Sequence, residues 1–148
     1  MRRALARANH LMVEERFSDA ADIFERLSGQ ARQRGMLGRA ANLTLQASRA
    51  RFVATDVESA LDHAREAMRL FIRAGRPERV SPVLARMTAA LREQGYESEA
   101  DRLEQEAEQA LGQVGRSLDQ ARQRAPRFSY FYAFSCSPSP AIVSSPLL

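Results

Sequence analysis

The stretch DVESALDHAREAMRLFIRAG, residues 56–75, carries the clearest helical pattern in this chain of 148 residues. Alanines and large apolar residues recur three and four positions apart along it, and charged residues follow another side. Such spacing is typical of an amphipathic helix with one buried face. Gly75 closes the stretch, and glycine readily takes the left-handed conformation that ends many helices. The stretch therefore predicts a packed helix over residues 56–74.

The same pattern returns forty residues away in both directions. An alanine recurs at Ala20, Ala60 and Ala100, and a glycine recurs at Gly35, Gly75 and Gly115. Repeats with a period between about 20 and 50 residues are typical of proteins in which stacked units share one continuous core. Such arrays commonly present extended binding surfaces. The sequence therefore predicts an all-α protein of stacked helical units whose function is binding.

The composition fits one soluble domain with a packed core. The chain is 45% hydrophobic and 27% charged, which is ordinary for a globular protein. Its 22 basic residues are all arginine, against 18 acidic residues, which leaves a net charge of +4. Because acids and arginines alternate along the expected helices, solvated faces are favoured over a nucleic-acid site. Nucleic-acid binding through the arginines is kept as a third hypothesis, which a steep salt dependence would distinguish.

Cysteine content and hydropathy limit the cellular setting. Cys136 is the only cysteine, so neither an internal disulfide nor a cysteine-rich zinc site is expected, and a reducing, cytoplasmic location is predicted. No run of about 18 apolar residues is present, and prolines interrupt the apolar C-terminal end, which argues against a membrane partner. The sequence sets no oligomeric state.

The repeat divides the chain into pairs of helices. In the first two units, helices are expected over residues 3–14, 18–34, 37–54 and 56–74. Pro77 opens the third unit, and Pro82 either lies in the first turns of its helix or, with Ser81 as cap, marks its start. Gly95 then turns the chain into the last helix.

Three helix starts carry residues whose side chains accept backbone hydrogen bonds. Ser18 stands just before the apolar stripe of its helix and is expected to cap it. Thr55 and Glu58 have the spacing of a capping box, in which each side chain accepts from the backbone N–H of the other residue. Ser98 with Asp101 is a similar start. The sequence therefore predicts side-chain caps at these junctions.

After Gly115 the repeat is not completed. Residues 117–125 are expected to form a short helix that caps the last repeat, so that one repeat domain covers residues 1–125. Residues 126–148 are rich in proline, serine and aromatic residues and hold no acid, and they are expected to form a disordered tail. Two alternatives stay open for this tail: docking of its aromatic residues on the helices, or an origin outside the domain.

The order of small and large residues within each unit resembles the tetratricopeptide repeat (TPR) over residues 1–115. The first unit matches best, at Ala8, Leu11, Phe17, Ala20, Phe24 and Leu27. The units are forty residues long, whereas the family usually has about 34. Arg51 and Glu104 also stand where large apolar residues are usual. The resemblance implies a right-handed solenoid of about three helical hairpins, and related hairpin arrays remain alternatives.

In similar proteins the first helix of each unit lines a concave groove that holds peptides. By this resemblance, the expected groove residues are Asn9, Met12, Asn42, Leu45, Arg49, Phe52, Ala89 and Arg92. From Arg26 to Arg51 the chain holds six arginines and no acid, so an acidic ligand is favoured near the second unit. A merely solvated face is the alternative for that run of arginines.

The chain lacks the sequence motifs of common enzyme classes. It has no glycine-rich phosphate loop, no nucleophile elbow and no His-Glu-x-x-His pair. His10 with Glu14 and His63 with Glu66 have spacings that can share a metal, but metal sites need three or four converging ligands. A non-catalytic interaction scaffold without metal or cofactor is therefore predicted, with a protein or peptide partner. The second hypothesis is a regulatory or sensory fragment of a longer multidomain protein.

Overall fold

The computed structural model describes residues 1–113 and residue 115, and this part of the chain is all-α. Its elements are α1 Arg2–Val13, α2 Phe17–Gln33, α3 Leu37–Val53, α4 Val57–Arg73, the short 3-10 helix η1 Pro77–Arg79, α5 Val80–Glu93 and α6 Glu97–Gln113. The predicted all-α class is confirmed, and the first four predicted helices agree with α1 to α4 to within one residue at either end. The predicted capping helix (residues 117–125) and tail (residues 126–148) lie outside the described residues.

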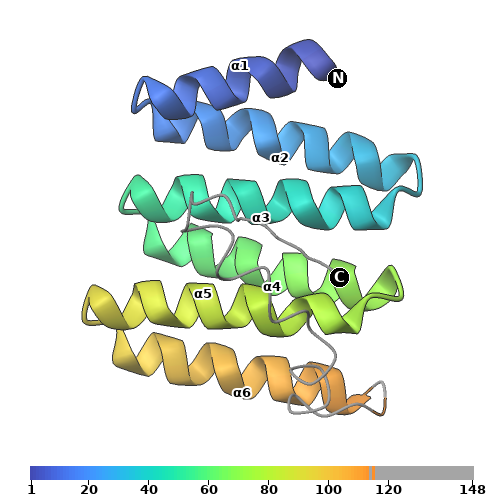
Figure 1. The fold of residues 1–148 in the computed structure, drawn as a ribbon, viewed down its shortest axis with the longest axis vertical. Coiled ribbons are helices and arrows are strands. Elements are labelled where there is room, and N and C mark those ends of the chain that lie inside the picture. Colours follow the sequence, from blue (N-terminus) through green and yellow to red (C-terminus); the bar gives the residue numbers. More distant parts are fainter. Residues whose placement is uncertain (114, 116–148) are drawn as a thin grey trace, which may run out of the picture.

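Helices that are neighbours in the sequence are neighbours in space and run antiparallel (Figure 1). Figure 1 shows them as a row along the long axis, with α1 at one end and α6 at the other. The row consists of three hairpins, α1–α2, α3–α4 and α5–α6, and α4 also contacts α6. None of the helices within the described range is long and apolar enough to cross a bilayer.

The same turn joins successive helices and recurs every twenty residues. Residues with positive φ stand at its centre: Glu15 (61°), Gly35 (73°), Thr55 (66°), Gly75 (76°), Gly95 (86°) and, after α6, Gly115 (76°). At the second turn, the Gly35 N–H donates to the carbonyl of Arg32 (2.9 Å), and the next N–H donates to that of Ala31 (2.9 Å). This pair of bonds is the Schellman motif, and the other four interhelical turns have it too. The forty-residue period of the sequence is therefore twice a twenty-residue helix period.

The residue after each positive-φ position ends one helix and begins the next. The N–H of Met36 closes α2, and its carbonyl accepts from the N–H of Ala40 (2.9 Å) as the first bond of α3. The equivalent alanines in α2, α4 and α6, each also 0% exposed, are Ala20, Ala60 and Ala100. Ser48 on α3 donates to the carbonyl of Ala60 (2.7 Å), so α3 lies directly against this position. The recurring alanine thus marks a close approach of helices.

The capping box expected at the start of α4 is wrong. Thr55 is the positive-φ residue of its turn, and its hydroxyl donates to the carbonyl of Ala54 (2.6 Å). Asp56 is the cap instead, because its carboxylate accepts from the N–H of Ser59 (3.3 Å). The Schellman turn fixes where the next helix begins, so the cap falls one residue later than the spacing of Thr55 and Glu58 indicates.

Ser18 and Ser98 do not cap helices either, because each is the second residue of its helix, α2 and α6 respectively. The start of the third unit is settled by the two prolines. Pro77 occupies the first position of η1, and Pro82 lies in the first turn of α5. Both positions tolerate a residue that lacks an N–H. Ser81 is therefore a helix residue and not a cap.

The apolar stripes of the helices form one core, to which all six α-helices contribute. Phe24 and Phe71, each 1% exposed, are the largest of its fully buried side chains, and alanine and leucine make up much of the rest. Two buried hydroxyls pair with each other between α2 and α3: the Oγ of Ser28 and the Oγ1 of Thr44 lie 2.6 Å apart. Close packing of small side chains fixes the rotation of each helix, and with it the residues that face outward.

Candidate binding surface

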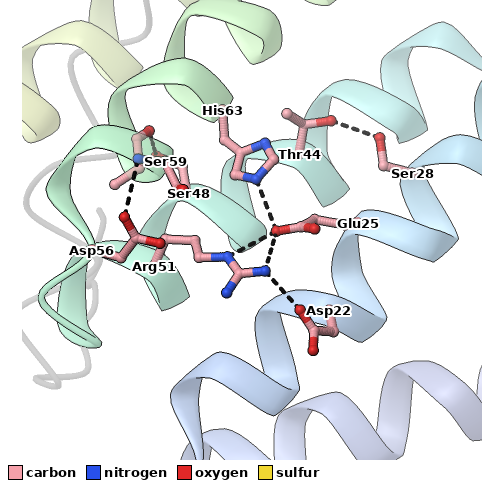
Figure 2. A network of polar contacts seen from close by, with 10 residues as sticks. Asp22, Glu25, Ser28, Thr44, Ser48, Arg51, Asp56, Ser59 and His63 are labelled. Atoms are coloured by element: carbon pink, nitrogen blue, oxygen red, sulfur yellow. Dashed lines mark hydrogen bonds and ion pairs between the residues drawn. The ribbon is translucent and has the colours of Figure 1, made fainter.

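A network of polar contacts around Arg51 joins α2, α3 and α4 (Figure 2). Arg51 on α3 contacts Asp22 (Nη2 to Oδ1, 2.6 Å) and Glu25 (Nη2 to Oε1, 2.8 Å), both on α2. The ring of His63 on α4 lies 2.8 Å from the same Glu25 oxygen. Figure 2 shows the Glu25 carboxylate between Arg51 and His63, so one acid links α2, α3 and α4. We call these four residues the Arg51 cluster.

The surroundings of Arg51 explain why an arginine stands where a large apolar residue is usual in the TPR pattern. Burial alone lowers the pKa of Arg51, but its hydrogen bonds to Glu25 and Asp22 outweigh burial and raise the pKa above its ordinary value. The side chain is only 18% exposed. A charge is tolerated there because two acids on the adjacent helix neutralise it.

Further ion pairs join α2 to α4 and α4 to α6. Arg32 contacts Glu66 (3.1 Å), and Arg65 contacts Glu106. The spacing of His63 and Glu66 therefore does not produce a shared site, because the two side chains point to different partners. His10 and Glu14 form an exposed pair at 3.1 Å. In residues 1–113 and 115, no group of three or more potential ligands is placed to hold a metal ion.

A different surface lies between α3 and α5, where a cavity of about 240 Å³ opens; we call it the groove. Its lining comes from two helix faces and η1: Asn42, Leu45, Gln46, Arg49, Arg79, Pro82, Val83, Arg86 and Met87. Val83 and Met87 are buried and Leu45 is partly buried, so they provide an apolar floor. Three arginines flank this floor, and no carboxylate among the described residues lines the groove.

The arginines of the groove keep their charges close together. Burial, followed by the positive charge of Arg86, lowers the pKa of Arg49. The guanidinium carbon of Arg79 lies 5.5 Å from the centroid of the Phe71 ring, a cation–π contact that holds the side chain without neutralising it. The groove is therefore positively charged and partly desolvated before any ligand arrives. Such a setting favours a negatively charged ligand.

A second cavity, of about 690 Å³, adjoins the groove at the start of α3 and shares Asn42 with it. It is lined by Arg39 on α3, Arg73 at the end of α4 and Arg76 in the turn that follows. We call these three arginines the edge site. Their guanidinium groups make no ion pair or hydrogen bond within the described part of the chain. The described lining of this cavity also contains no carboxylate.

Two other cavities differ from these in charge. The cavity between α1 and α2, of about 540 Å³, contains Asp19 and Asp22 beside its arginines, and Arg16 contacts Asp19 at 2.8 Å. The cavity between α4 and α6, of about 280 Å³, contains the Arg65–Glu106 pair. Each of these two linings includes at least one carboxylate, although arginines outnumber the acids, whereas no carboxylate is among the described lining residues of the groove or of the edge-site cavity.

The structure brings Asn42, Leu45 and Arg49 of the predicted groove residues into the groove. They share one face of α3, because they stand three and seven positions apart. Of these three residues, Arg49 carries a positive charge, which favours an acidic ligand. The central part of the predicted site therefore coincides with a real cavity.

The other five predicted groove residues do not line this cavity: Asn9, Met12, Phe52, Ala89 and Arg92. Met12 and Phe52 are partly buried against the core, and Asn9 and Ala89 are exposed on α1 and α5. Arg92 donates to Glu104 and Asp101 on α6, both at 3.1 Å, so its charge is neutralised within the third hairpin. That pairing also accounts for Glu104, the second departure from the TPR pattern.

Sequence analysis missed the α5 side of the groove. Its lining residues stand three, four and seven positions apart, as on one helix face: Arg79, Pro82, Val83 and Arg86. The same spacing occurs on α3 from Asn42 to Arg49. Two equally spaced basic faces were therefore present in the sequence, but only the packing of the helices shows that they meet.

Comparison with protein-family models, with curated proteins and with solved structures finds no significant match for this chain. The resemblance to TPR proteins therefore rests on the sequence residues quoted above alone.

Proposed function

We propose that the chain is a non-catalytic interaction module that holds an acidic peptide, or an acidic segment of a partner protein, in the groove. The observation that carries this proposal is an apolar floor flanked by three arginines, with no carboxylate in the described lining. Elsewhere the same chain places acids against several of its arginines, such as Arg51 and Arg65. Like charges held close together oppose folding. Arrangements that lower stability in this way are expected mainly at functional sites.

The groups in the groove are suited to a short acidic segment. An arginine side chain donates paired N–H bonds to a carboxylate, which gives both strength and direction. Leu45 and Met87 offer apolar contact, and methionine adapts to side chains of different shape. The amide of Asn42 both donates and accepts, so it can bond to a ligand backbone. Because Arg49 is already partly desolvated, pairing it with a ligand carboxylate adds little further desolvation cost.

This function agrees with a TPR-like array, in which the first helix of each hairpin faces the ligand. Here α3 and α5 are the first helices of the second and third hairpins. In this proposal the three hairpins form a right-handed solenoid, and the groove lies on its concave side. The TPR pattern of the first unit and the forty-residue hairpin period support the assignment. The proposed setting is the cytoplasm.

The floor of the groove favours a protein ligand over nucleic acid. Sites for single-stranded nucleic acid combine basic residues with aromatic side chains on which bases stack. The described lining of the groove contains no aromatic residue, and aliphatic groups occupy its floor. An acidic protein segment can match both features, because it alternates carboxylates with apolar side chains.

Peptide selection from a random-sequence display library tests the proposal, and enrichment of peptides that combine acidic and apolar residues is expected. For an enriched peptide, Arg49→Glu is expected to weaken binding roughly 10–100-fold, because it removes attraction and adds repulsion. Arg102→Glu is the control, because Arg102 lies exposed on α6 without a side-chain partner among the described residues, and its substitution changes the net charge equally. Equal weakening by both variants, or enrichment of peptides without acids, would contradict the proposal.

A further inference from the structure

The edge site has no role in the function proposed so far. Its three arginines come from separate segments: α3, the end of α4 and the turn before η1. None of their guanidinium groups is engaged by a side chain of residues 1–113 and 115. Three positive charges around one cavity produce a local potential that attracts anions. The arrangement is thus explained more readily by a ligand than by the needs of the fold.

The edge site and the groove are continuous along α3. Asn42 lines both, and it lies between Arg39 of the edge site and Arg49 of the groove. Arg39 and Arg49 are ten positions apart on one helix, which separates them by about 15 Å along its axis. A ligand that lies along α3 therefore meets arginines at both ends of this span, with Leu45 between them.

We propose that the ligand is an extended acidic segment of a partner protein with carboxylates at both ends of this span, one set at Arg49 and one at the edge site. This inference rests on the proposed function of the groove. A span of about 15 Å corresponds to roughly four or five residues of extended chain. We take the extended form because it covers this span in the fewest residues, whereas a helix needs about ten residues to cover about 15 Å.

The middle of the span distinguishes such a segment from a nucleic-acid strand. A strand carries a phosphate at every nucleotide, so it places charge along its whole length. Bound here, it would set phosphates against the apolar side chains of Leu45, Val83 and Met87. A protein segment can place an apolar residue at the same point and keep its charges at the two ends.

Synthetic fluorescein-labelled peptides test the two-ended ligand by fluorescence polarisation. The main probe is Asp-Glu-Gly-Leu-Gly-Asp-Glu, whose two acidic pairs are centred five positions apart, or about 16 Å in extended chain, and two further probes replace one or the other Asp-Glu pair by Gly-Ser. Wild-type protein is expected to bind the two-pair probe at least about tenfold more tightly than either one-pair probe, because the second contact becomes intramolecular. A two-pair probe with a long Gly-Ser linker is expected to lose most of this gain.

Arg76→Glu is the decisive variant, since Arg76 is exposed and its guanidinium group has no partner within residues 1–113 and 115. It is expected to reduce binding of the two-pair probe to the one-pair level and to change the one-pair binding at the groove by less than about twofold. Arg102→Glu serves again as the charge-matched control. Thermal melting by circular dichroism verifies that both variants keep the helical fold.

The outcomes separate this inference from the function on which it rests. If Arg76→Glu acts no more strongly than Arg102→Glu while Arg49→Glu still weakens binding, the groove stands and the two-ended ligand is overturned. If Arg49→Glu has no effect on any probe, the proposed function itself fails. If an oligo-thymidine strand binds more tightly than the two-pair probe and loses affinity steeply with salt, nucleic acid is the ligand and the inference is overturned.

Discussion

Arg49 and Arg51 stand two positions apart on α3 and have opposite surroundings. Arg51 contacts two carboxylates of α2, at 2.6 and 2.8 Å. Arg49 lines the groove with Arg86 of α5, and burial together with that second positive charge lowers its pKa. Both belong to one run of arginines in the sequence, so the run alone does not indicate a ligand. The helix that faces each arginine makes the difference, because α2 places acids beside Arg51 and α5 places another arginine near Arg49.

This difference separates stability from binding. The folded state is expected to depend on Arg51. Its removal leaves the partly buried Glu25 and the exposed Asp22 without the cation that they share. The fold does not depend on the charge of Arg49, which is partly desolvated beside a like charge. The same substitution is therefore expected to have opposite effects at the two positions. Four predictions, in order of decreasing effect, test this comparison without any ligand.

The largest effect is expected for Ala60→Leu, which disturbs the helix contact on which both sides of α3 depend. Ala60 is 0% exposed, and its carbonyl accepts from Ser48 on α3. A larger side chain forces α3 away from α4, and the free energy of unfolding is expected to fall by about 2–3 kcal/mol. Urea denaturation measures this change, with the exposed Ala6→Leu as control. An unchanged midpoint would show that the recurring alanine does not mark a close approach.

Arg51→Met is expected to lower the free energy of unfolding by about 1–2 kcal/mol, because two carboxylates lose charged hydrogen bonds in a partly buried place. The matched control is Arg16→Met, which removes an exposed pair with Asp19 and is expected to cost less than about 0.5 kcal/mol. Chemical denaturation of both variants gives the comparison. Equal losses at the two positions would mean that the Arg51 cluster stabilises the fold no more than an exposed ion pair does.

Thr55→Gly is expected to raise the free energy of unfolding by about 0.5–1 kcal/mol, because glycine takes positive φ without steric cost. Thr55 ends α3 at φ 66°, so the variant tightens the turn and leaves both arginine environments unchanged. Gly75→Ala, at φ 76° in the next turn, is expected to act in the opposite direction by a similar amount. If both variants shift the melting temperature in the same direction, the two turns are not equivalent.

The smallest effect, a gain of up to about 0.5 kcal/mol in the free energy of unfolding, is expected for Arg49→Met. Burial is the larger cause of the lowered pKa of Arg49 and the charge of Arg86 the smaller. Because salt screens the second and not the first, most of the gain is expected to persist in 1 M sodium chloride, where the Debye length is about 3 Å. A clear loss of stability would remove the contrast with Arg51.

The sequence predicts the helices closely but shows only half of the repeat. Gly35, Gly75 and Gly95 are visible as turn residues because glycine is favoured at positive φ. Glu15 and Thr55 take the same conformation, with φ angles of 61° and 66°, although their side chains give no indication of it in the sequence. Their backbone is held by the two hydrogen bonds of the Schellman motif, whose acceptors are carbonyls in the last turn of the preceding helix. A search for glycine therefore shows the twenty-residue spacing from Gly75 to Gly95 and Gly115 but misses the turns at Glu15 and Thr55.

The lining of the groove was predictable where one helix suffices to define it. Asn42, Leu45 and Arg49 follow from the spacing of a single helix face. Arg92 has a similar place on α5 and is excluded only because acids on α6 reach its guanidinium group. The edge site joins three segments of the chain, and its position depends on where two turns lie beside each other. Contacts between helices depend on how the helices are aligned against one another. The residue pattern of a single helix does not contain that information.

The short, repeated turn also has a consequence for the rate at which the chain folds. Each interhelical linker in the first two hairpins is three residues long, so neighbouring helices meet without closing a long loop. Chains dominated by such local contacts typically fold in microseconds to milliseconds. The contacts from Glu25 to His63 and from Arg65 to Glu106 join residues 38 and 41 positions apart, and their loop-closure entropy is correspondingly larger. The hairpins are therefore expected to form first. The contacts between hairpins are expected to form afterwards and to stabilise the relative positions of the hairpins.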